Sequence, residues 1–209
     1  MRILPVLIAT LALAGAAAAQ INHPYNEVGI YTVEQPDGCA TARVEVPVGG
    51  EFWCYLVLTN PWNEALDRPV TTVGGFEFRL GIPEGVIVLA SVYPPFHIDD
   101  CFGCWPDFRV GANMPVNNGF RTLMPFQIMV TTGEPVFLSM APTAVTPSSI
   151  PGEIVFTDYD DDFSLQVMHP VSGSFDVPVF AINWDGDLSF CQTVPLRDES
   201  FGSLKALYR

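Results

Sequence analysis

The chain has 209 residues, of which 49% are hydrophobic and 12% aromatic, so it can bury a substantial core and is not a disordered chain. Its formal net charge is −14 and its pI is near 4.3, and Lys205 is its only lysine. This acidic balance argues against binding to nucleic acid or to an anionic membrane surface, because both require basic patches.

The first 19 residues have the layout of a secretory signal peptide. Met1 and Arg2 form a short positive start, residues 3–15 are apolar, and residues 16–19 are four alanines that offer small side chains for cleavage. The apolar segment is shorter than the roughly 20 residues that a membrane span needs. We therefore expect residues 1–19 to be removed, and the mature chain to be secreted to the cell surface, the medium or the periplasm with no integral membrane segment.

Short apolar segments separated by Gly, Pro, Asn and Asp recur through the rest of the chain, which is typical of strands joined by turns. The predicted strands are residues 28–33, 41–46, 52–59, 75–80, 86–92, 122–131, 136–140, 153–157, 163–168 and 177–182. The 19 prolines leave few windows for a helix. The pattern predicts an all-β protein with one antiparallel, immunoglobulin-like β-sandwich over residues 20–197.

Two of these segments alternate between apolar and other side chains. In residues 76–80 the apolar Phe76 and Phe78 flank Glu77, and in residues 163–168 the apolar Phe163 and Leu165 flank Ser164. A period of two predicts strands whose apolar side chains face the core and whose polar side chains face water.

Five cysteines follow the signal peptide, and an exported chain is expected to form disulfides. Cys54 lies within an apolar run and is interpreted as a buried free thiol. Cys39 and Cys191 lie in turn-like contexts near the two ends of the domain. A bridge between them would close a long loop and stabilise the fold by about 4–5 kcal/mol.

The other two cysteines form a Cys-x-x-Cys motif. Cys101 and Cys104 lie between prolines, so no helix begins there to stabilise a reactive thiolate. We predict a structural disulfide that closes a tight loop. The alternative is a zinc site in which His97 and Asp99 join the two thiolates.

Alternating carboxylates mark one acidic turn. Asp158, Asp160 and Asp162 have the spacing that converges on a hard cation in calcium loops. An EF-hand loop also needs glycine at its sixth position and glutamate at its twelfth, where this chain has Phe163 and His169. We interpret the segment as an acidic turn without a cofactor, and a Ca²⁺ site formed together with residues 183–187 is the alternative.

Two tryptophans are expected at the surface. Trp62 and Trp105 are flanked by turn residues, and flat exposed aromatic rings are where sugar rings stack. They are therefore candidate ligand-binding residues, with ordinary packing as the alternative. No hydrolase constellation accompanies them, because none of the three histidines lies in a recognised catalytic motif.

Residues 73–86, with Phe76, Phe78, Leu80 and Pro83 in a glycine-flanked strand, resemble a segment of cohesin-type secreted bacterial sandwiches. In that segment a second strand follows, which here is residues 88–92. The resemblance implies a cohesin-like sandwich, and a sandwich supports many functions.

The last residues, 198–209, resemble an ending shared by uncharacterised secreted proteins of Gram-negative bacteria. The matching residues are Phe201, Gly202, Lys205, Leu207, Tyr208 and Arg209, with Phe201 where the ending usually has Trp. The resemblance implies an exported surface or extracellular protein of unknown activity, and these six residues are candidates for a recognition tail. Ser200 is a good N-cap, so the tail is predicted either to form one short helix or to be a frayed terminus.

Together these observations predict a non-catalytic secreted adhesion or binding module that contacts protein or glycan and needs no cofactor. The alternative is a structural or surface-assembly protein of the cell envelope. A hydrolase with an unrecognised site is the third hypothesis.

Overall fold

The computed structural model of the chain describes residues 25–101, 103–144, 148–187 and 191. The predicted signal peptide (1–19) and the predicted recognition tail, with all six of its candidate residues, lie outside the described residues. Within them there is no α-helix, and no helix is long and apolar enough to cross a membrane.

The described residues form strands joined by turns and one 3-10 turn at Cys39–Thr41. The strands are β1 (Glu27–Tyr31), β2 (Arg43–Val44), β3 (Glu51–Thr59), β4 (Trp62–Asn63), β5 (Arg68–Pro69), β6 (Thr72–Gly81), β7 (Val86–Ser91), β8 (Ile98–Asp99), β9 (Asp107–Pro115), β10 (Phe120–Val130), β11 (Val136–Ala141), β12 (Ile154–Asp158), β13 (Ser164–Pro170) and β14 (Phe180–Ile182).

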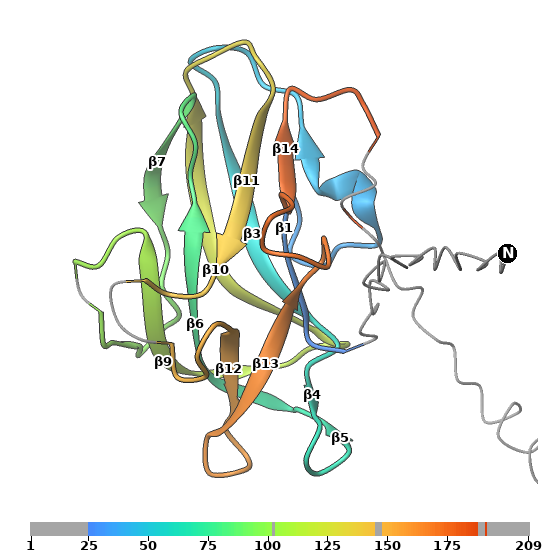
Figure 1. Cartoon of the computed structure of the whole chain (residues 1–209), viewed down its shortest axis with the longest axis vertical. Helices are drawn as coiled ribbons and strands as arrows, with labels where there is room; N and C mark the ends of the chain where they lie inside the picture. Colours follow the sequence, from blue (N-terminus) through green and yellow to red (C-terminus); the bar gives the residue numbers. More distant parts are fainter. Residues whose placement is uncertain (1–24, 102, 145–147, 188–190, 192–209) are drawn as a thin grey trace, which may run out of the picture.

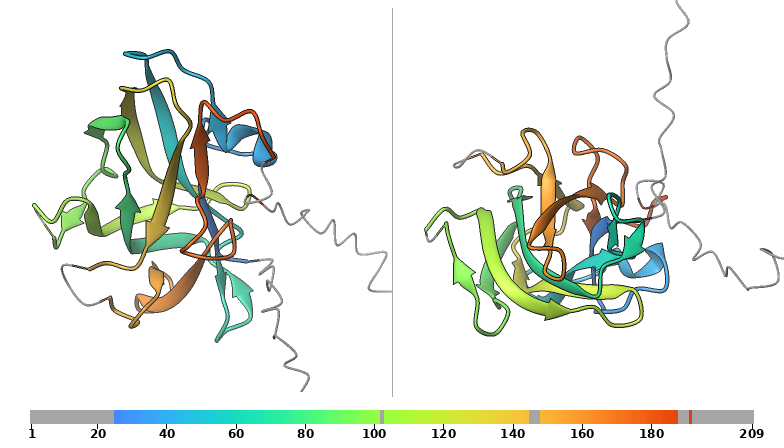
Figure 2. Two further views of the ribbon diagram at one scale, coloured as in Figure 1. Left: turned by 45° about the horizontal axis from the view of Figure 1, so that its top comes forward. Right: turned by 90° about the horizontal axis from the view of Figure 1, so that it is seen from below.

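The predicted all-β sandwich is confirmed. One layer contains β8, β9, β6, β12 and β13, and the other contains β1, β3, β10 and β7. β13 pairs with β1 and so joins the layers, while β11, β14 and β2 extend from the end of β6. Almost all pairs are antiparallel, with short parallel ladders at β1–β13 and β14–β2. Figure 1 shows β9, β6, β12 and β13 side by side in the lower half of the molecule, and Figure 2 shows the curvature of the strands from below.

Aromatic rings from both layers meet in the core. Phe108 on β9 stacks on Phe78 of β6, with ring centroids 4.9 Å apart, and meets Phe126 of β10 at 5.9 Å. Cys54 on β3 is fully buried among these layers, and burial raises the pKa of its thiol to about 12. The free cysteine is therefore a packing residue with little thiolate at neutral pH.

Both predicted cysteine pairs lie at disulfide distance. Cys39 and Cys191 have Cα atoms 5.5 Å apart across 152 residues of sequence, so this pair ties the start of the domain to its end. Cys101 and Cys104 have Cα atoms 5.3 Å apart and close a turn in which the Cys104 amide donates to the Cys101 carbonyl.

All ten predicted strands are present, and the prediction missed β9 and the short β4, β5 and β8. β9 begins after Pro106 and ends at Pro115, and both residues suggest turns when read alone. Its period-two signal was nevertheless present, because Phe108, Val110 and Met114 are buried at alternate positions.

The predicted faces of two strands need correction. On β13 the alternation has the opposite phase: Phe163 and Leu165 face solvent, whereas Gln166 is buried. On β6 the expected wet side chain, Glu77, is buried because a loop covers it. Both corrections concern the outer face of the same sheet, where the candidate site lies.

Candidate functional site

A row of five side-chain positions crosses the outer face of the β8–β9–β6–β12–β13 layer. The strand registers place the following residues opposite one another in order: Leu165, Thr157, Gly75, Gly111 and Ile98. The two glycines in the middle have no side chains, while Leu165 and Ile98 at the ends are 43% and 73% exposed. The row therefore forms an apolar groove with glycine as its floor.

The groove is a cavity of about 310 Å³. A Cβ atom at Gly75 would lie 2.7 Å from the carbonyl oxygen of Val110, so this part of the floor accepts only glycine. A Cβ atom at Gly111 would have no neighbour closer than 3.9 Å, so the space above it is open. Phe163, which is half exposed, also lines the groove and extends its apolar wall.

A buried carboxylate forms one rim of the groove. Glu77 Oε1 accepts hydrogen bonds from the Ser148 hydroxyl (2.7 Å) and the Ser149 amide (2.5 Å), and Oε2 accepts one from the Ser149 hydroxyl (2.9 Å). Arg109 Nε lies 3.3 Å from Glu77 Oε2 and 3.6 Å from Asp100, whose side chain is 72% exposed. Both Glu77 oxygens are thus engaged, so the rim is a fixed polar edge and Glu77 is not a free acid or base.

The predicted calcium residues do not form one cluster of ligands. Asp158 is fully buried, and its Oδ2 accepts hydrogen bonds from Asn63 Nδ2 (2.9 Å) and Arg68 Nη2 (2.8 Å) of the β4–β5 hairpin. Asp160 accepts a hydrogen bond from Thr71 (2.5 Å), and Asp162 is exposed. Among the residues that the structure describes, no three Asp, Glu, His or Cys side chains are placed to hold a metal ion.

The turn itself is held by hydrogen bonds to a fourth acidic residue. Asp161 accepts a hydrogen bond from Asn63 Nδ2 (2.9 Å), and hydrogen bonds from Ser164 and Asn63 lower the pKa of its carboxyl. The acidic turn therefore docks the β4–β5 hairpin onto the end of the sheet.

The alternative zinc site is not formed. The sulfurs of Cys101 and Cys104 lie at disulfide distance from one another. Asp99 Oδ1 accepts a hydrogen bond from the Cys101 amide (3.0 Å), and the His97 ring stacks on Tyr93. Asp99 therefore supports the turn between β8 and β9, and His97 packs within the segment between β7 and β8.

The structure does not bring Trp62 and Trp105 together. Trp62 on β4 stacks on Tyr25 with ring centroids 4.5 Å apart, in a separate cavity of about 310 Å³ that Pro61 and Pro69 also line. Trp105 precedes β9, is half exposed and meets Phe108 edge-on. Sugar binding by either tryptophan stays a prediction.

The groove was not predicted from the sequence. Gly75 was included in a predicted strand, and Gly111 and Ile98 lie in strands that were missed. An available signal was the opposite phase on β13, since Phe163 and Leu165 are two large apolar residues that alternate with Ser164 and Gln166. Periodicity alone does not say which set faces the core when both sets contain residues that pack well.

In comparisons with known proteins, no family and no curated protein matches the sequence. Three solved structures are similar. A type II cohesin domain from the cellulosome of Acetivibrio cellulolyticus has a TM-score of 0.47 and 14% identity, over 78% of this chain and 97% of that chain. A non-cellulosomal cohesin from the hyperthermophilic archaeon Archaeoglobus fulgidus has a TM-score of 0.34 and 19% identity, over 60% of this chain and 80% of that chain. The 35 kDa C-terminal fragment of the major pilin GBS80 of Streptococcus agalactiae has a TM-score of 0.39 and 9% identity, over 70% of this chain and 53% of that chain.

Proposed function

We propose that this protein is a non-catalytic secreted binding module that docks a partner protein on its apolar groove. The observation that supports this proposal is the cross-strand row from Leu165 to Ile98, in which two glycines leave a hollow between exposed apolar side chains. Exposed apolar patches with polar rims mark protein interaction sites, since an isolated chain gains nothing by leaving them in water.

The chemistry of the groove indicates the kind of partner. Its floor and ends favour an apolar ridge of side chains, which would displace water from the glycines. The rim carries the exposed Asp100 carboxylate, and the chain as a whole has a net charge of −14. A partner with basic residues beside its apolar ridge complements both features.

The test fills the groove without disturbing the fold. Gly111→Leu places a side chain in the open space above the floor, whereas Gly111→Ala adds one methyl group at a position with no neighbour closer than 3.9 Å. We expect both variants to melt within a few degrees of the wild type. We expect Gly111→Leu to lose partner binding and Gly111→Ala to retain most of it.

The partner is detected by photo-crosslinkers placed at Ile98 and at Leu165, with Glu51 on the other layer as the control position. The proteins secreted by the source organism are the binding mixture. A single protein that crosslinks at both groove positions, is displaced by unlabelled wild type and is not displaced by Gly111→Leu would support the proposal. Equal labelling at Glu51, or full competition by Gly111→Leu, would contradict it.

A second candidate function is surface assembly, and the edge strand β7 favours it. β7 has one pairing partner, β10, among the described residues, and its sequence contains neither charge nor proline. Ile87 and Leu89 on it are close to half exposed. Natural edge strands usually carry charge or proline to prevent pairing between molecules.

Assembly through β7 predicts concentration-dependent association. Sedimentation velocity of the wild type should then show oligomers that Ile87→Lys abolishes and Gly111→Leu leaves unchanged. A monomer at all concentrations would remove this candidate.

A further inference from the structure

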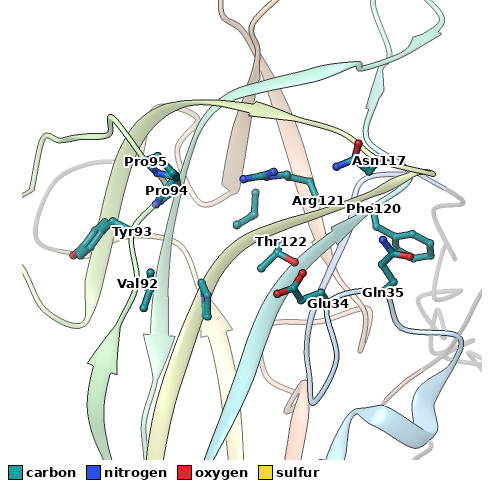
Figure 3. Close-up of a pocket in the computed structure, with 12 residues that line it drawn as sticks. Glu34, Gln35, Val92, Tyr93, Pro94, Pro95, Asn117, Phe120, Arg121 and Thr122 are labelled. Atoms are coloured by element: carbon teal, nitrogen blue, oxygen red, sulfur yellow. The ribbon is translucent and has the colours of Figure 1, made fainter.

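A third pocket lies apart from the groove and the Trp62 cavity, and it differs from the groove in chemistry. It has a volume of about 260 Å³ and lies between the start of β10, the segment after β7 and the segment after β1 (Figure 3). A β-bulge between Thr122 and Met124 interrupts the pairing of β10 with β3 here. Bulges re-aim side chains, and Arg121 and Thr122 both line this pocket.

One donor of Arg121, its Nε, has no partner within the described residues. Its Nη1 donates to the Pro115 carbonyl (3.3 Å), whereas its Nε is buried and has no hydrogen-bond partner among the described residues. Burial lowers the pKa of Arg121, because the guanidinium loses hydration, and the nearby Glu34 carboxylate partly opposes this. Buried donors are satisfied in most proteins, so a guanidinium beside a cavity whose Nε has no partner is a candidate ligand contact.

Glu34 brings the opposite charge to the same pocket without neutralising Arg121. No ion pair within 4 Å joins Arg121 to a carboxylate in the part of the chain that the structure describes. Figure 3 shows the Glu34 carboxylate directed toward Thr122, and the Arg121 guanidinium directed toward the segment that contains Pro94 and Pro95. The pocket therefore has a strong donor on one side and a strong acceptor on another.

The remaining polar lining balances donors and acceptors. Asn117 and Gln35 supply amides and Thr122 a hydroxyl, each of which can both donate and accept. An anionic ligand would meet Glu34, and a cationic ligand would meet Arg121. A neutral ligand rich in hydroxyl groups can accept from Arg121 and donate to Glu34 at once, and it also uses the amides.

We infer that this pocket binds a neutral carbohydrate, as one or two sugar rings, independently of the protein docking proposed for the groove. The sugar hydroxyls bridge Arg121 and Glu34, and the rings of Pro94 and Pro95 supply an apolar surface for the carbon face of the sugar. The guanidinium turns toward the ligand, which satisfies the donor left unpaired in the free protein.

The test follows amide chemical shifts by NMR during titration with neutral monosaccharides and disaccharides, and a glycan array extends the set of sugars. We expect saturable shifts of the amides of Val92 and Tyr93 and of residues 117–122. Glu34→Gln, at an exposed position, should weaken binding by at least about tenfold with an unchanged Tm. Arg121→Gln should do the same, and Glu45→Gln, exposed outside the pocket, should bind as the wild type does.

Several outcomes would overturn the inference. One is the absence of any saturable sugar binding in both assays. Another is equal binding by Glu34→Gln and the wild type. A third is a pocket response to free glycine or to acetate that exceeds the response to every sugar, which would show a site for a zwitterion or an anion instead.

Discussion

Two carboxylates are buried on adjoining strands of one sheet, and they organise different regions of the molecule. Asp158, at the end of β12, binds Arg68 and Asn63 and so holds the β4–β5 hairpin. Glu77, in the middle of β6, binds Ser148 and Ser149 and shares Arg109 with the exposed Asp100. The first cluster joins the hairpin to the end of the sheet, whereas the second ends in the exposed Asp100 carboxylate beside an apolar groove.

Asp158 therefore stabilises the fold, whereas Glu77 stabilises the fold and also positions the rim of the groove. Replacing a group in the Asp158 cluster leaves its partners unsatisfied, so we expect a loss of stability without an effect on the groove. Replacing a group in the cluster at the groove rim also moves the rim. The predictions below use this contrast, in order of decreasing effect.

The largest loss of stability is expected when Asp158 is replaced. Asp158→Asn removes the charge opposite Arg68 and turns an amide donor toward the Asn63 amide, so the free energy of unfolding should fall by about 2–4 kcal/mol. Asp162→Asn is the matched control, because Asp162 is exposed, and it should change stability by less than about 0.5 kcal/mol. Urea unfolding followed by tryptophan fluorescence measures both, and equal effects would show that the hairpin docking contributes little.

A smaller loss is expected at Glu77. Glu77→Gln keeps one acceptor oxygen but presents an amide donor to the Ser149 hydroxyl or to Arg109, which should cost about 1–3 kcal/mol. Because the rim then moves, crosslinking from Ile98 to the partner should also weaken. Glu134→Gln, at an exposed site, is the control, and a Glu77 variant that lost stability with unchanged crosslinking would place Glu77 in the same structural category as Asp158.

The two clusters also show which parts of the structure could be predicted from the sequence and which could not. The ten main strands follow from apolar segments bounded by Gly and Pro, because strand formation depends on local pattern. The burial of Glu77 does not follow, since the loop that covers it lies about 70 residues away in sequence. The Asp158 cluster is similarly non-local, because its partners are in a hairpin whose strands have two residues each. The groove required knowledge of register across five strands, which no single segment contains.

A third carboxylate, that of Glu27, is expected to make the stability of the protein depend on pH. Burial raises the pKa of Glu27 on β1 from 4.5 to about 7. Between these values the unfolded chain has released the proton and the folded chain retains it, so the contribution of Glu27 to stability falls as pH rises from 4.5 to 7. Glu27→Gln should match the wild type at pH 4.5 and be more stable at pH 8. Unfolding curves at pH 4.5, 6 and 8 test this, and a constant difference between the two proteins would contradict it.

The smallest expected effect is that of calcium on the acidic turn. In Asp158, Oδ2 accepts from Asn63 and Arg68 and Oδ1 accepts from the Asp160 amide, and the Arg68 guanidinium, 2.8 Å from Oδ2, would repel a cation. A ligand present at about 100 times its Kd adds about 2.7 kcal/mol, which is a Tm increase of several degrees. We expect the Tm in millimolar Ca²⁺ and in excess chelator to agree within about 1 °C. If a larger shift occurs, Asp160→Asn and Asp162→Asn identify its origin. Loss of the shift in these variants would mean that the turn releases Arg68 and binds the cation.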